Sequence, residues 1–207
     1  MFESLLKLFG CSPKNNQDKY QAQTDSLKQQ IAQSIETFKN KPAITVLTVE
    51  IIDTTSDEDL LYMVFDNLCS KLPTDYTKEY EAVLTWNKSR QTIFVTFGLE
   101  AEVNNGGYNQ YYYNSTGQYY KLAPDALELI GATKYAELTR KADETYEKDN
   151  KKITKELDGT LEGFSKSYKD NPLNKFDDEF YALAKIENIE KLQIQYIREH
   201  KKDFIDK

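Results

Sequence analysis

The sequence predicts a mainly α-helical protein, organised as a single multi-helix globular domain with a short N-terminal helical extension. Apolar residues recur at spacings of three and four along most of the chain, which is the pattern of amphipathic helices. Pro42, Pro73 and Gly131 stand between these periodic segments, where helices end. Hydrophobic residues make up 39% and charged residues 29% of the 207 residues, close to the composition of soluble globular proteins. We expect an extension with an amphipathic helix over residues 1–40 and the helical domain over residues 41–207.

The first elements follow from this periodicity. Residues 10–19 have the composition of a polar linker, and residues 20–38 predict one amphipathic helix. Residues 44–52 fit a strand, because many are β-branched, but they also fit one face of a helix, which we favour. Ser56 and Asp59 predict a capping box at the start of the next helix, with aspartate in place of the usual glutamate. That helix carries apolar residues at Leu60, Leu61, Val64, Phe65, Leu68 and Leu72.

The middle of the chain predicts a helix over residues 76–84 and another over residues 89–103. Residues 92–97 would be predicted as a strand in isolation, so propensity and context conflict there. Gly106 and Gly107 are expected to end the helix as a C-terminal cap, because glycine enters left-handed conformations at little steric cost. A short helix then begins near Tyr108.

The C-terminal part predicts helices over residues 123–130 and 133–148, separated by a glycine. Residues 149–174 are polar and punctuated by glycine and proline, so we expect a long loop or a broken helix. Residues 177–184 and 189–204 predict the last two helices.

The acidic charge of the chain is concentrated in one segment. The formal net charge is -7, from 34 acids and 27 bases. Residues 42–70 contain no lysine or arginine and six acids, namely Glu50, Asp53, Asp57, Glu58, Asp59 and Asp66. Direct nucleic-acid binding is disfavoured, since it usually depends on clustered lysine and arginine. The segment suits a basic partner surface, although the charges by themselves favour the simpler interpretation, a solvated face of ordinary helices.

Other site chemistries have little support. Cys11 and Cys69 are far apart and belong to no metal-binding or disulfide pattern, so we predict no metal, no cofactor and a reducing cytoplasmic location. The single histidine, His200, lies among basic residues near the C-terminus, and no nucleophile with its base is evident. No segment approaches the roughly 20 apolar residues of a membrane span. We therefore predict a protein that is not an enzyme.

Residues 102–117 are the most unusual segment, because a double glycine leads into a cluster of tyrosine, glutamine and asparagine. A helix that begins near Tyr108 would place Tyr108, Tyr111 and Tyr112 on one face. It would place Gln110 and Asn114 on another face. We favour packing of this aromatic face in the core, with the two amides bonded to nearby turn backbone. The exposed tyrosines are then expected to be Tyr113, Tyr119 and Tyr120.

The order of residues in this segment carries a family resemblance. It contains Glu102, Asn105, Gly106, Gly107, Tyr108, Gln110, Tyr111, Asn114, Ser115 and Gly117, in the order NGG[FY]xQ[FY][FY]xNSxG from Asn105 onward. Ala126-Leu127 and Phe176-Asp177 begin two further matching stretches. The whole resembles the bacterial DNA-mimic protein family, long filed as a domain of unknown function, over residues 45–205. The resemblance implies a helical fold and, for the member that named the family, binding to a DNA-binding regulator in place of DNA.

Two classes of function remain. The first is a non-catalytic protein-interaction module, either an acidic DNA mimic that binds a DNA-binding regulator or an immunity-type protein that neutralises a basic toxin. Its partner-binding residues would be Asp53, Asp57, Glu58, Asp59, Asp66, Tyr113, Tyr119 and Tyr120. The second is a small-molecule or enzymatic pocket walled by Glu102, Asn105, Tyr108, Gln110 and Asn114. A homodimer is compatible with either class.

Overall fold

The computed structural model describes Lys28 and residues 46–206. The chain divides into two compact units, Met1–Ala43 and Ile44–Lys207. The expected linker over residues 10–19 lies outside the described residues. So does the helix expected over residues 20–38, apart from Lys28, which is helical and exposed.

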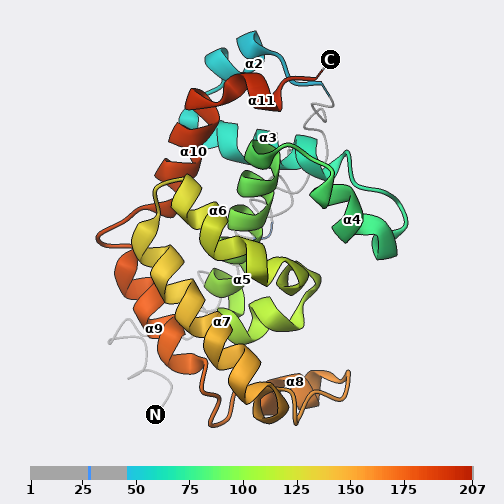
Figure 1. Ribbon diagram of the computed structural model, residues 1–207, viewed down its shortest axis with the longest axis vertical. Coiled ribbons are helices and arrows are strands. Elements are labelled where there is room, and N and C mark those ends of the chain that lie inside the picture. The colour runs from blue at the N-terminus through green and yellow to red at the C-terminus, as the bar shows by residue number, and fades with distance from the viewer. Residues whose placement is uncertain (1–27, 29–45, 207) are drawn as a thin grey trace, which may run out of the picture. The chain divides into compact units, whose positions relative to one another are not determined.

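The second unit is built from helices, and residues 46–206 contain no strand, so the predicted mainly α-helical fold is confirmed (Figure 1). The elements are α2 (Val49–Thr54), α3 (Asp57–Cys69), η2 (Tyr76–Lys78), α4 (Glu79–Leu84), α5 (Lys88–Tyr113), η3 (Ser115–Leu122), α6 (Ala123–Leu129), α7 (Thr133–Ile153), α8 (Leu161–Ser167), α9 (Asn174–Leu183), α10 (Ile189–Glu199) and α11 (Lys201–Phe204).

The ambiguous segment at residues 44–52 becomes helical from Val49 onward. Thr48 caps this helix, because its side-chain oxygen accepts a hydrogen bond from the backbone N–H of Ile51. Ser56 occupies the N-cap of α3 as predicted, but the expected capping box does not form. Its hydroxyl instead donates to the carboxylate of Asp59 at 3.4 Å, and no side-chain cap reaches the backbone.

Helix α5 lies at the centre of the unit, packed against η3, α6, α9, α3 and α10 (Figure 1). Its strand-like stretch, residues 92–97, is helical. Helix α5 buries residues on several sides, including Ile93, Leu99 and Val103, because neighbours surround it. Tertiary packing therefore decides the helical state where local propensity favours a strand.

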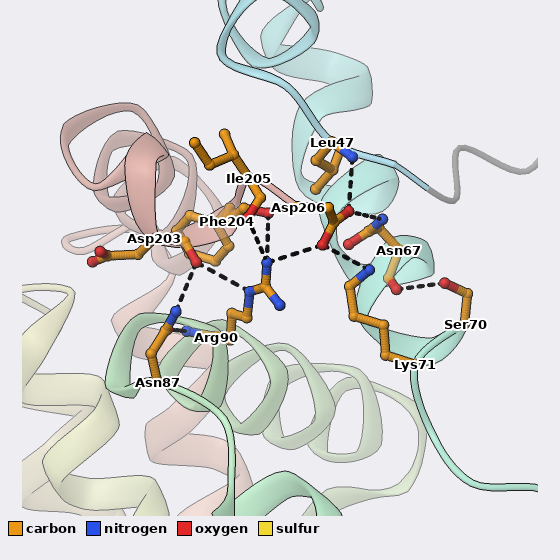
Figure 2. A network of polar contacts seen from close by, with 10 residues as sticks. All are labelled: Leu47, Asn67, Ser70, Lys71, Asn87, Arg90, Asp203, Phe204, Ile205 and Asp206. Atoms are coloured by element: carbon orange, nitrogen blue, oxygen red, sulfur yellow. Dashed lines mark hydrogen bonds and ion pairs between the residues drawn. The ribbon is translucent and has the colours of Figure 1, made fainter.

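The C-terminal tail is fastened to the start of the unit by a polar network (Figure 2). The guanidinium group of Arg90 on α5 donates to the carbonyl oxygens of Asp203, Phe204 and Ile205 at 2.9 to 3.0 Å. The carboxylate of Asp206 accepts from Arg90, the backbone N–H of Leu47, and the side chains of Asn67 and Lys71. The bond between Leu47 and Asp206 joins residues that are 159 positions apart in the chain.

The predicted loop at residues 149–174 contains more helix than expected. Helix α7 continues past residue 148 to Ile153, with a kink at Asp149, and α8 lies inside the polar stretch. Of the two predicted alternatives, a long loop or a broken helix, the structure has the broken helix. The helix predicted over residues 189–204 divides at His200 into α10 and α11.

Candidate functional site

The double glycine breaks α5 into two segments. Gly107 adopts φ 72° and ψ -177°, a region almost restricted to glycine, and Gly106 is also non-helical. The carboxylate of Asp177 on α9 accepts a hydrogen bond of 2.7 Å from the backbone N–H of Tyr108, so it caps the second segment. A Cβ on Gly107 would lie 2.3 Å from an oxygen of Asp177. Glycine is needed here both for its backbone conformation and for the close approach of this cap.

Two tyrosine hydroxyls satisfy carbonyl groups at the same break. Tyr168 donates to the carbonyl oxygen of Gly106 and Tyr181 to that of Val103, each at 2.8 Å. Helix ends leave such carbonyls without intrahelical partners, so these bonds stabilise the bend. Asp177, Tyr168 and Tyr181 were not predicted for this role, since each lies more than 60 positions from its partner in the chain.

The amides of Gln110 and Asn114 bridge the break from the other side. Both donate to the same carboxylate oxygen of Glu102, at 2.7 Å and 2.8 Å. The prediction that they share a face is confirmed, but their partner is a side-chain carboxylate rather than turn backbone. Asn105 and Ser115 are exposed. The side chains of Glu102, Gln110 and Asn114 are therefore hydrogen-bonded to one another.

The tyrosine cluster divides between core and surface. Tyr108, Tyr111 and Tyr112 are buried, as packing of the aromatic face predicts. The hydroxyl of Tyr108 lies 2.8 Å from that of Thr139, and the hydroxyl of Tyr112 donates to Asp143 at 2.6 Å. Burial raises the pKa of Asp143 to about 7, against the opposing effect of the Tyr112 hydrogen bond.

The prediction that Tyr119 is exposed is wrong. Tyr113 is 41% exposed and Tyr120 is half-buried, but Tyr119 is only 2% exposed. Residues 115–122 form a 3-10 helix, whose period of about three residues per turn differs from that of an α-helix. Tyr119 therefore points inward, where its hydroxyl donates to Glu79 at 3.0 Å. Gly117 in the same element passes so close to Tyr111 that a Cβ would lie 2.6 Å from its carbonyl oxygen.

The five acids predicted to bind a partner are all exposed, but two are neutralised within the molecule. The five predicted acids are Asp53, Asp57, Glu58, Asp59 and Asp66, and the neutralised two are Asp53 and Asp57. Lys201 lies 2.8 Å from both carboxylate oxygens of Asp53, and Arg198 pairs with Asp57 at 2.6 Å. Arg198 also donates to the carbonyl oxygens of Ile52 and Thr55. Asp53 and Asp57 consequently serve to dock α10 and α11 on α2 and α3.

A surface groove lies between the N-terminal end of α3 and helix α10. Its volume is about 510 Å³, and we call it the acidic groove; its lining is Asp57, Glu58, Asn188, Glu190, Lys191, Ile194, Gln195, Arg198 and Glu199. Glu58, Glu190 and Glu199 are exposed acids, and Lys191 is the base that remains once Arg198 has paired with Asp57. Ile194 adds an apolar element, with 8% of its surface exposed. The sequence did not predict the α10 acids, because their place beside α3 depends on the tertiary fold.

A second, smaller hollow continues the acidic surface. It shares Asn188 and Glu190 with the acidic groove and adds Glu100 and Glu187, with no lysine or arginine in its lining. Burial, with a smaller effect of Glu190, raises the pKa of Glu100 to about 7. Acids from α3, α5 and the start of α10 therefore meet on one surface.

The described residues contain neither a metal site nor a membrane-spanning helix. Within residues 46–206, no group of three or more histidine, cysteine, aspartate or glutamate side chains is arranged to hold a metal ion. In the same part of the chain, no helix combines the length and the apolar character that crossing a bilayer requires.

Over residues 46–206, the fold and the site define an all-helical protein with a bent central helix and an acidic surface groove. The model of the family described as DMP19-like protein matches residues 84–200, which is more than half of the chain. The chain belongs to this family, which is of the DNA-mimic type. No curated protein and no solved structure matches the sequence of this chain. The matched range includes the central segment at residues 102–117 and most of the acidic groove, but it is narrower than the expected residues 45–205.

Proposed function

We propose that this protein is a non-catalytic interaction module that binds a basic protein partner through the acidic groove. The observation that carries the proposal is the meeting of Glu58 with Glu190 and Glu199 around one groove. These acids come from helices that are far apart in the sequence. Family membership supports the same kind of function, because a DNA mimic presents negative charge to a DNA-binding protein.

The charges favour electrostatic recognition of a cationic surface. Glu58, Glu190 and Glu199 have no basic partner within the described residues, whereas Asp57 is paired with Arg198. Exposed acids around a groove concentrate negative potential there, which accelerates association with a basic partner and makes it sensitive to salt. Ile194 offers an apolar contact beside these charges. The partner would therefore be a DNA-binding regulator or a basic toxin that presents lysine and arginine next to an apolar side chain.

The central motif has a supporting role in this proposal. Glu102, Gln110 and Asn114 hold the two segments of α5 together, and α5 in turn contacts both α3 and α10. Their mutual hydrogen bonds favour a structural role over a small-molecule or catalytic pocket. We accordingly propose a cytoplasmic binding protein that carries out no reaction.

The test is affinity capture from the cell that produces the protein, with elution by salt. The bait proteins are the wild-type chain, the variant Glu58→Lys/Glu199→Lys, and the control Glu144→Lys/Asp178→Lys. All four altered acids are exposed, and the two variants change the net charge equally. Asp57 is left unchanged because its loss would release Arg198 from its docking contact.

We expect the wild-type chain and the control to retain a basic protein that moderate salt elutes, and the groove variant to lose it. Surface charge effects are long-ranged, so the control is essential. Equal retention by the groove variant and the wild-type chain would refute the proposed surface. Equal loss in both variants would show that net charge, and not the groove, directs binding.

A further inference from the structure

A pocket rich in lysine lies at the opposite end of this unit from α3. Figure 1 shows α8 and the end of α7 at one end of the long axis, with α2, α3 and α11 at the other. The pocket has a volume of about 480 Å³ and is lined by Lys152, Ile153, Lys155, Glu156, Lys166, Ser167, Lys169, Asp170, Asn171 and Pro172. Four lysines and two acids thus surround one cavity of a protein whose net charge is -7.

Two of these lysines are free to bind a ligand. Lys155 lies 3.4 Å from Glu156, and Lys166 pairs with Glu162 at 2.6 Å. In the part of the chain that the structure describes, Lys152 and Lys169 are paired with no acid. Lysine near a helix C-terminus often compensates the helix dipole, and Lys152 has this role at the end of α7. Lys169 lies beyond the end of α8, so its position at the pocket has no such explanation.

The wall of the pocket is fixed by a buried network of hydrogen bonds. The amide of Asn171 donates to Asn109 and to the carbonyl oxygen of Ser167, each at 2.9 Å. Asn109 on α5 in turn donates to the hydroxyl of Ser167 at 2.8 Å. Asn109, Ser167 and Asn171 are all buried. The segment that carries Lys166 and Lys169 is therefore tied to the core, and this wall of the cavity is preorganised.

We propose that this pocket binds a small compound that carries a diphosphate or similar multiply charged phosphate group. Lysine binds phosphate as a compact point charge, and the cavity volume lies in the range of small-molecule sites. Four lysines stand against Glu156 and Asp170 of the lining and against Glu162, which pairs with Lys166, so one positive charge remains in surplus. Ile153 and Pro172 add an apolar side to the cavity. The site is separate from the acidic groove and independent of the partner proposed for it.

The probe for this site is inorganic pyrophosphate, added to the full chain at low ionic strength and followed by titration calorimetry. The variant Lys152→Gln/Lys169→Gln removes the two available charges. The variant Lys185→Gln/Lys202→Gln is the matched control, because both of its lysines are exposed and lie outside the pocket. Far-UV circular dichroism checks that each variant retains its helices.

We expect saturable one-to-one binding by the wild-type chain and the control, weakened about tenfold or more in the pocket variant. Backbone amide chemical shifts of the wild-type chain should change mainly at residues 152–172. The absence of saturable binding at millimolar pyrophosphate would overturn the proposal. Equal weakening in both variants, or shift changes spread over lysines of the whole surface, would also overturn it.

Discussion

Replacing Gly107 by alanine is expected to destabilise the protein severely. At φ 72° and ψ -177° the backbone lies in a region that costs a residue other than glycine about 1–3 kcal/mol. The new Cβ would also lie 2.3 Å from an oxygen of Asp177 and displace the cap of Tyr108, which costs about 1–2 kcal/mol. The sum, about 2–5 kcal/mol, is a large part of the 5–15 kcal/mol that typically stabilises a domain.

The assay is urea unfolding followed by far-UV circular dichroism, and Gly159 provides the matched control. Gly159 also has a positive φ, 84°, but an added Cβ there meets no atom within 4 Å. Gly159→Ala should therefore cost only about 1 kcal/mol, from the left-handed backbone alone. A double-mutant cycle with Asp177→Ala isolates the clash, because the alanine leaves room for the new Cβ.

In the Asp177→Ala background, Gly107→Ala should lose about 1–2 kcal/mol of its cost, since no cap remains to be displaced. If Gly107→Ala costs no more than Gly159→Ala, the proposed structural role of the double glycine is refuted. If the cost of Gly107→Ala is unchanged by Asp177→Ala, the cap plays no part in it.

Three further predictions concern other contacts of the fold. Arg90→Met should cost about 2–4 kcal/mol in urea unfolding, because it leaves the tail carbonyls of Phe204 and Ile205 without their donor and removes one of the two cations beside Asp206. Arg140→Met, at an exposed pair, should cost less than about 1 kcal/mol, and similar costs for the two variants would contradict the role of the tail network. Glu102→Ala should cost about 2 kcal/mol by leaving two amides without an acceptor, and thermal unfolding with no change in Tm would count against this bridge. Burial raises the pKa of Asp143 to about 7, above its ordinary value of 3.8, so the folded state holds the proton more tightly and its stability falls as pH rises from about 4 to about 7. Asp143→Asn should therefore be more favourable relative to wild type at pH 8 than at pH 4, and an equal difference at the two pH values would contradict the shift.

The order of the helices followed from the sequence where periodicity and punctuation agreed. The apolar spacing of α3 and the capping position of Ser56 were both visible locally. The break at Gly106 and Gly107 was also predicted from residue type alone. Each of these features depends on neighbours within about four residues, which is the range over which helix signals act.

The contacts that define the surface could not be predicted in this way. The segment at residues 42–70 contains no base, yet Asp53 and Asp57 are neutralised by Lys201 and Arg198 from more than 140 positions away. The inward turn of Tyr119 depends on a 3-10 helix, whose period differs from the one assumed. Local charge counting therefore found Glu58, but not Glu190 and Glu199, which the tertiary fold places beside it.

Carboxyl footprinting of the captured complex tests the acidic groove most directly. Carbodiimide labelling with mass spectrometry would be compared for the free chain and for the chain with its basic partner. We predict that Glu58, Glu190 and Glu199 are protected in the complex, while the exposed Glu144 and Asp178 are labelled equally in both states. Unchanged labelling of all three groove acids in a saturated complex would contradict the proposed function.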